Sequence, residues 1–215
     1  MEIKTVTNTV TEYLRKLIIV GEFSAGQRIN ETDLAVSLKI SRPPIRESLR
    51  ILENETLVVN IPRKGTYVTD ISSERLRDIC QAREMLECYA IDILKAKKIK
   101  TLPDVIASLE SASELPIPSQ DNKDEVFDYL KAFVDFHIKL IEASGNSWVI
   151  HFYKSIASHL ARYQFIYLYV PGTGSRSTEE HYKIMDLIKS GNYEKAKKIM
   201  KDHTNYIFEF LRNKI

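Results

Sequence analysis

Apolar residues in the first 70 positions follow two different periods. Spacings of three and four residues predict three short helices, from Thr7 or Asn8 to Val20, from Asn30 to Leu38 and from Ser41 to Glu53. Two β-type runs then flank a "PRKG" turn, which predicts a hairpin with Gly65 at the flexible position. Three short helices followed by a hairpin are typical of a winged helix-turn-helix domain.

The remainder of the chain has helical period throughout. The apolar spacing and the capping residues predict six helices, at about 73–98, 102–113, 123–144, 147–169, 178–189 and 193–213. Thr101 and Ser177 are the expected caps of the second and the fifth of these. A boundary at 70–73 divides the chain into domains 1–71 and 72–215. The expected fold class is mainly α, with an N-terminal winged helix-turn-helix and a C-terminal all-α bundle of about six helices.

Composition narrows the class of protein without indicating a partner. With 44% hydrophobic and 28% charged residues the chain reads as an ordinary globular protein, and no apolar run approaches the roughly 18 residues that span a bilayer. The first ten residues lack the features of a secretion signal, which predicts a cytoplasmic location. Cys80 and Cys88 lie about 12 Å apart along one predicted helix, so they are expected to be reduced. Because the net charge is only +2, any nucleic-acid signal must be local.

A local signal of that kind is present in "SRPPIRESLR", residues 41–50. Proline is tolerated in the first helical turn, and Arg42, Arg46 and Arg50 fall within an arc of about 80° beside the buried apolar stripe. A row of arginines is by itself more often a solvated helix face, but its place between two helices and a basic hairpin favours a recognition helix. The predicted DNA-binding residues are Ser41, Arg42, Pro43, Arg46, Arg50, Arg63, Lys64 and Gly65. Arg50 serves equally well as a phosphate contact or an intrahelical partner.

Residues 17–69 also resemble the DNA-binding domain of GntR-type bacterial transcription regulators. The resemblance lies in the "GEF-x-x-G" turn, the "E-x-x-LA-x-x-L-x-I-SR-x-P-IRE-x-LR-x-LE" core and the "RKGTYV" hairpin. It implies that Arg42 and Arg46 read the operator, assisted by Ser41 and the hairpin at 64–65. Thr56 stands where the family usually has glycine, so a positive φ there would strain the threonine by about 1 kcal/mol.

Three histidines share an unusual position in the second domain. His137, His181 and His203 each lie on the apolar stripe of a different predicted helix, and the last two helices form a hairpin about Gly191. A single histidine of this kind is more often a core residue bonded to a neighbour. Three imidazoles converging inside a bundle suit a divalent metal ion, zinc or nickel, with open positions for water or a ligand carboxylate.

Arg83 also lies on an apolar stripe, and a buried guanidinium needs an anion. Glu87, four residues on, could pair with it structurally. A bound carboxylate effector is the functional alternative, and the sequence leaves both open.

The region from Glu74 to the C-terminus is similar to the FCD ligand-binding domain of FadR-type members of the same family. The shared pieces are "QAREMLE", "FH-x-x-L-x-x-ASGN" and "EEH-x-x-I-x-x-x-I-x-x-GN-x-x-x-A-x-x-x-M-x-x-H". The resemblance implies a metal held by three histidines and an aspartate, with a small organic acid bound beside it. Phe133 occupies the aspartate position here, and Arg83 and Asn146 are the expected effector contacts.

These expectations together describe a homodimeric transcription regulator that binds a palindromic double-stranded operator and responds to a small carboxylate. The alternative is a metal-dependent hydrolase in which the three histidines activate water. That alternative needs a positioned general base, and the chain has no H-E-x-x-H spacing.

Overall fold

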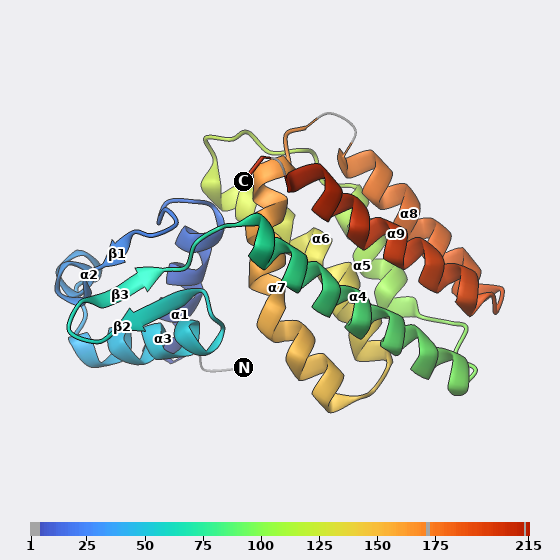
Figure 1. The fold of residues 1–215 in the computed structure, drawn as a ribbon, viewed down its shortest axis with the longest axis horizontal. Helices are drawn as coiled ribbons and strands as arrows, with labels where there is room; N and C mark the ends of the chain where they lie inside the picture. Colours follow the sequence, from blue (N-terminus) through green and yellow to red (C-terminus); the bar gives the residue numbers. More distant parts are fainter. Residues whose placement is uncertain (1–4, 171–172, 213) are drawn as a thin grey trace. The chain divides into compact units, whose positions relative to one another are not determined.

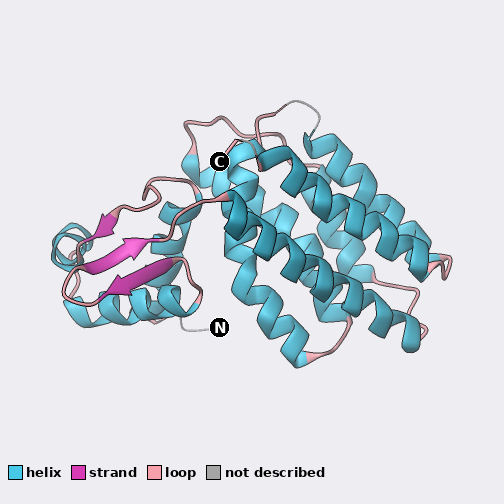
Figure 2. Ribbon diagram, in the orientation of Figure 1, coloured by secondary structure: helices cyan, strands magenta, loops and turns pink. Residues whose placement is uncertain are grey.

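The computed structural model describes residues 5–170, 173–212 and 214–215. The chain divides into two compact units, Met1–Ile71 and Ser72–Ile215, and each is described by itself. Helices and strands are labelled in Figure 1 and distinguished by colour in Figure 2.

The first unit packs three helices against a small antiparallel sheet. Its elements are α1 (Val6–Ile19), β1 (Arg28–Ile29), α2 (Glu31–Leu38), α3 (Arg42–Asn54), β2 (Val58–Ile61) and β3 (Gly65–Val68). The strand order is β1-β3-β2 (Figure 2), and β2 pairs with β3 from Val58↔Val68 to Ile61↔Gly65. The apolar stripes of α1 and α3 meet in one core with Leu57, which follows the third helix. Burial of this stripe fixes which face of α3 is left to solvent.

Strand β1 was not predicted from the sequence. Its two residues pair with Tyr67 and Thr66 of β3, and Ile29 is buried in the core. A strand of two residues is too short to produce an alternating pattern, so only its tertiary pairing reveals it.

The turn after α3 contains a strained threonine, as the sequence led us to expect. Thr56 has φ 57°, in the left-handed region, and its N–H donates to the carbonyl oxygen of Glu53 at 2.8 Å. A β-branched residue in this region carries a steric cost that glycine avoids.

We therefore expect Thr56→Gly to be more stable than Thr56→Ala by about 1 kcal/mol, because only glycine relieves the left-handed strain. Urea denaturation of the two variants measures the difference. Equal midpoints for glycine and alanine would show that the turn carries no strain at this position.

The second unit is entirely helical in the described residues. Its elements are α4 (Ser73–Ala96), α5 (Pro103–Ser113), α6 (Lys123–Ala143), α7 (Ser147–Tyr167), α8 (Thr173–Lys189) and α9 (Tyr193–Leu211). Apolar side chains from α4, α5, α6, α8 and α9 form one core cluster, and a second cluster joins α4, α6 and α7. The predicted fold class, a winged helix-turn-helix with an all-α bundle, is confirmed.

Two predicted helix caps were wrong. Helix α8 begins at Thr173, so Ser177 lies inside it and is not its cap. The first turn forms despite its glycine and serines because Thr173 is buried against the bundle, and tertiary packing overrides weak helix propensity. Helix α5 has Leu102 as its N-cap residue in place of Thr101, because the buried Leu102 anchors the turn and Pro103 begins the helix.

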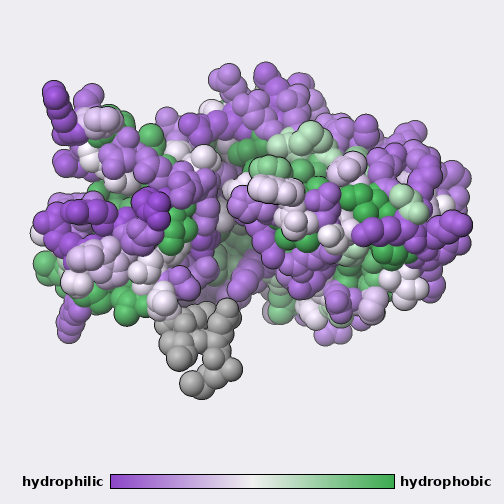
Figure 3. All heavy atoms as spheres, turned by 90° about the horizontal axis from the view of Figure 1, so that it is seen from below, coloured by the Kyte–Doolittle hydropathy of each residue, from purple (hydrophilic) through white to green (hydrophobic). Residues whose placement is uncertain are grey.

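Polar side chains cover most of the face drawn in Figure 3, and apolar side chains form smaller separate patches on it. Among the described residues, no helix combines the length and low charge needed to cross a bilayer. Cys80 and Cys88 are buried free thiols, and burial raises the pKa of each to about 11. They are therefore protonated packing residues at neutral pH.

Candidate functional site

The solvent-facing side of α3 carries the arginines singled out from the sequence. Arg42 and Arg46 have side chains 55% and 68% exposed, while Ile45 is fully buried on the opposite side. Ser41 is the N-cap residue by backbone geometry, but its hydroxyl makes no capping hydrogen bond within the described chain. Pro43 and Pro44 in the first turn lack the N–H groups that a capping side chain would bind.

An acidic residue on the neighbouring helix separates the three arginines into two groups. The Glu31 carboxylate of α2 contacts Arg46 at 3.3 Å and Arg42 at 3.7 Å. Arg50 instead pairs with Glu47 on its own helix, at 2.7 Å. No pattern in the sequence singles out Glu31, because its pairing with the arginines depends on how α2 and α3 pack. Glu31 holds two guanidinium groups together on one surface, and Arg50 is engaged elsewhere.

The hairpin turn places further basic groups at the tip of the sheet. Arg63 and Lys64 are exposed between β2 and β3, and Arg63 has φ 65°. Gly65 has φ 108°, and a Cβ built there would lie 3.2 Å from Nε of Arg28. The absence of a side chain at Gly65 thus lets the Arg28 side chain of β1 lie against the turn. Arg28 joins Arg63 and Lys64 as a third basic residue at this tip, and no sequence pattern indicated it.

The three stripe histidines come together inside the helical unit. His137 of α6, His181 of α8 and His203 of α9 are 1–3% exposed, and one ligand nitrogen from each lies within 4.8 Å of the others. Nε2 of His181 and Nε2 of His203 are 3.3 Å apart. A tetrahedral site with metal–nitrogen bonds of about 2.0–2.1 Å needs ligand separations of roughly 3.3–3.4 Å. The His181–His203 pair therefore has the spacing that such a site requires.

Burial keeps these imidazoles neutral. Removal from water lowers the pKa of His181 well below its usual value and lowers that of His203, and it lowers the pKa of His137 to about 3. A neutral imidazole retains a lone pair on one nitrogen, which is the form that coordinates a metal.

A carboxylate orients one of the histidines. Oε2 of Glu180 lies 2.9 Å from Nδ1 of His203, and Arg176 donates to Oε1 of the same carboxylate at 2.9 Å. With its proton on Nδ1, His203 presents the Nε2 lone pair to the cluster. Nδ1 of His181 is buried and has no hydrogen-bond partner among the described residues. The sequence motif contained Glu180, but its bond to His203 depends on the packing of α8 against α9.

Arg83 forms the structural ion pair with Glu87 that the sequence offered as one alternative. Its Nε donates to Oε1 of Glu87 at 2.9 Å, and both side chains are buried. Although burial alone would raise the pKa of Glu87, the Arg83 guanidinium and the bonds from His137 and Tyr153 hold that pKa well below its usual range. The charge of Arg83 is therefore balanced within the protein.

The same guanidinium contacts the histidine cluster. Nη2 of Arg83 lies 2.7 Å from Nε2 of His137, and Oε1 of Glu87 lies 3.0 Å from Nδ1 of His137. His137 thus donates from Nδ1 and accepts at Nε2. The cluster fits a divalent ion in the neutral state of its imidazoles and in the His181–His203 spacing. His137 can serve as the third ligand only when the Arg83 guanidinium moves off Nε2, because one lone pair cannot both accept that hydrogen bond and bind a metal.

Two other predicted residues have local roles in the structure. Phe133 packs against Tyr129, with ring centroids 4.7 Å apart, and supplies no ligand atom where the family aspartate is expected. Oδ1 of Asn146 accepts from the backbone N–H groups of Trp148 and Val149, so this residue caps α7. Its role as an effector contact stays a prediction.

Replacing Glu180 with glutamine is expected to weaken zinc binding about 10- to 100-fold, because the neutral amide no longer fixes the His203 tautomer. Glu179→Gln, one residue earlier and exposed, is the matched control and should leave zinc affinity unchanged. Competition against a chromophoric chelator measures both. Equal affinities for the two variants would mean that Glu180 does not orient the ligand.

Both units match known protein families. Residues 6–68 match the family described as "Bacterial regulatory proteins, gntR family", and residues 78–206 match the FCD domain. Both families consist of transcriptional regulators, so the chain is a regulator and the hydrolase alternative is set aside.

Individual relatives support the same assignment. The uncharacterized HTH-type transcriptional regulator YdhC of Bacillus subtilis (strain 168) is 29% identical over 204 residues, spanning 93% of this chain and 88% of the relative. The gluconate operon transcriptional repressor of the same organism is 26% identical over 136 residues, 63% of this chain and 54% of the relative.

Solved structures share the fold at low identity. Escherichia coli McbR/YncC superposes with a TM-score of 0.75 at 17% identity and 99% coverage of both chains. A GntR regulator from Rhodococcus sp. RHA1 has a TM-score of 0.75 at 22% identity, covering 95% of this chain and 96% of that one. The chain belongs to the gntR family of bacterial regulatory proteins, as a DNA-binding transcription regulator with an FCD domain.

Proposed function

We propose that this regulator is a homodimer whose affinity for a palindromic operator is controlled by a small carboxylate bound at a divalent metal site in the FCD domain. The observation that carries the proposal is the cluster of His137, His181 and His203, three buried neutral imidazoles from three helices. Zinc or nickel suits these nitrogen ligands.

The operator-reading part of the proposal rests on the exposed face of α3. Arg42 and Arg46 enter the major groove and contact guanine edges, while Ser41 and Pro43 set the start of the helix. Arg50, Arg63, Lys64 and Gly65 lie at the phosphates, where basic side chains and close backbone approach fix the register. Such a protein acts in the cytoplasm, where the chromosomal operator is.

Dimerisation follows from the size of the target. One recognition helix reads a short half-site, and a two-fold protein matches a palindrome with two such helices. The effector then changes operator affinity by binding more tightly to one arrangement of the paired DNA-binding domains than to the other.

The carboxylate contact is supported by the composition of the site. When bound, a divalent ion supplies positive charge and an open coordination position that a carboxylate fills. Arg83, beside His137, is a second candidate contact for the same carboxylate. The similarity to a repressor named for the gluconate operon also favours a small organic acid.

Metal analysis of the purified protein, followed by melting-temperature shifts with acetate and related acids, tests this proposal. We expect bound zinc or nickel and an acid-dependent stabilisation that disappears in His181→Ala. If the protein binds no metal and no acid shifts its melting temperature, the control mechanism is wrong, although DNA binding is unaffected by that result.

A further inference from the structure

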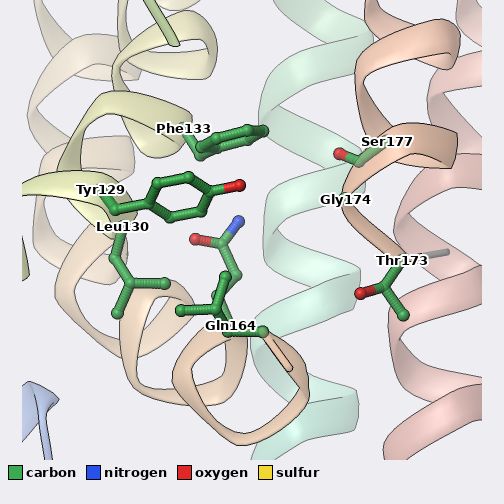
Figure 4. Close-up of a pocket in the computed structure, with 8 residues that line it drawn as sticks. Tyr129, Leu130, Phe133, Gln164, Thr173, Gly174 and Ser177 are labelled. Carbon is green, nitrogen blue, oxygen red and sulfur yellow. The ribbon is translucent and has the colours of Figure 1, made fainter. Parts of the chain in front are cut away.

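A small pocket lies between α6, α7 and the first turns of α8 (Figure 4). Its volume is about 30 Å³ within a region of about 350 Å³ that is partly open to solvent. The lining residues are Tyr129, Leu130, Phe133, Gln164, Leu168, Thr173, Gly174 and Ser177. A narrow pocket of this size admits a slender group more readily than a bulky one.

The pocket and the histidine cluster are formed by successive turns of the same two helices, α6 and α8. Phe133 precedes His137 by four residues on α6, and Ser177 precedes His181 by four residues on α8. Four residues are about one helical turn, a rise of roughly 5–6 Å. The pocket therefore lies about one helical turn from the histidine cluster on both α6 and α8, within reach of the far end of a short acid.

The lining is uncharged. No charged side chain lines the pocket among the described residues, and burial raises the pKa of Tyr129, which keeps its phenol protonated. A second carboxylate placed here would lose its hydration without gaining a counter-charge. The pocket therefore disfavours dicarboxylic acids.

The neutral polar side chains that border the space are those of Tyr129, Gln164, Thr173 and Ser177. In Figure 4 the Tyr129 hydroxyl and the Gln164 amide lie on one side, and the Ser177 hydroxyl lies on α8 across from them. Oε1 of Gln164 is buried and has no hydrogen-bond partner within the described part of the chain. Burying an unpaired acceptor is costly, and a ligand hydroxyl would relieve that cost.

We infer that the effector is a short monocarboxylic acid with an uncharged, hydroxyl-bearing tail, and that this pocket binds the tail. The inference rests on the proposed function, because it takes the carboxylate to lie at the histidine site. Gln164 recognises the hydroxyl, while Phe133 and Leu130 supply the apolar wall. Phe133, at the position of the family aspartate, thereby selects for an apolar segment next to the carboxylate.

Three acids with the same four-carbon chain test the tail directly. 4-Hydroxybutyrate, butyrate and succinate differ only at the end opposite the shared carboxylate. Calorimetric titration of the zinc-loaded protein should rank 4-hydroxybutyrate about three- to tenfold tighter than butyrate, since one net hydrogen bond is gained. Succinate should bind at least about tenfold more weakly than butyrate.

Two substitutions assign the ranking to this pocket. Gln164→Met keeps the side-chain length but removes the amide, so it should abolish the preference for 4-hydroxybutyrate over butyrate. Gly174→Leu projects a side chain toward the Tyr129 hydroxyl, which lies 3.8 Å from a Cβ built at Gly174. It should weaken binding of 4-hydroxybutyrate and butyrate and spare acetate, which is too short to reach the pocket. Zinc content should be unchanged in both variants.

The outcomes separate this inference from the proposed function. If acetate binds and succinate binds as tightly as butyrate, the pocket does not select the tail, although carboxylate control at the metal survives. A ranking that persists in Gln164→Met also overturns the assignment. If zinc binds and no acid binds at all, both the inference and the effector part of the proposed function fail.

Discussion

Arg46→Ala is expected to reduce affinity for operator DNA by roughly fivefold to 150-fold for each half-site, the value of one bidentate arginine–guanine contact. Arg46 is 68% exposed on the recognition helix and held beside Arg42 by Glu31. Its removal takes away base recognition without disturbing the core, because Ile45 and Leu49 carry the packing of α3.

Fluorescence anisotropy measures this loss of affinity. The DNA is a duplex that the wild-type protein selects from a random library. Arg50→Ala is the matched control, since Arg50 is 64% exposed on the same helix but pairs with Glu47. We expect a smaller loss for Arg50→Ala, nearly equal for selected and unrelated DNA, as for a phosphate contact. If both variants lose the same affinity for the selected duplex, Arg46 does not contact the bases.

Arg83→Met is expected to destabilise the protein by about 3–5 kcal/mol, the usual cost of breaking a buried ion pair by removing one partner. The guanidinium is 1% exposed and the Glu87 carboxylate is fully buried, so the remaining charge has no access to water. His137 also loses the donor that contacts its Nε2. The free energy of unfolding, from urea denaturation, reports the effect.

Two further variants separate the buried pair from ordinary surface charge. Lys201→Met removes a pair with Glu84 in which the lysine is 52% exposed, and it should change the free energy of unfolding by less than about 1 kcal/mol. Adding Glu87→Gln to Arg83→Met should restore much of the lost stability, because no uncompensated charge remains. If Arg83→Met lowers the free energy of unfolding no more than Lys201→Met does, the Arg83–Glu87 pair does not stabilise the site.

Hydrophobic period was sufficient to predict the architecture because most of the helices carry a buried apolar stripe at helical spacing. It predicted both domain types, and Thr56 was identified from a single departure in the motif. It missed β1, which has only two residues, and the first turn of α8, where local composition favours a loop and packing decides otherwise. Features stabilised mainly by tertiary contact leave little periodic signal in a sequence.

The histidine cluster was predictable for a related reason: a buried stripe places His137, His181 and His203 toward a common core. The groups around it were not, because their roles depend on which atoms meet. The sequence allows either Glu87 or a bound ligand as the partner of Arg83. In the structure Arg83 contacts both Glu87 and His137. Glu180, Glu31 and the neutral pocket beside Phe133 became apparent only from the packing of neighbouring helices.

The most direct test of the account is operator affinity with and without effector, measured by anisotropy on the zinc-loaded wild type and on His181→Ala. We predict that butyrate changes the dissociation constant of the wild type, and that the change is absent in His181→Ala while affinity without effector is retained. An equal response to butyrate in both proteins would contradict control through the histidine site.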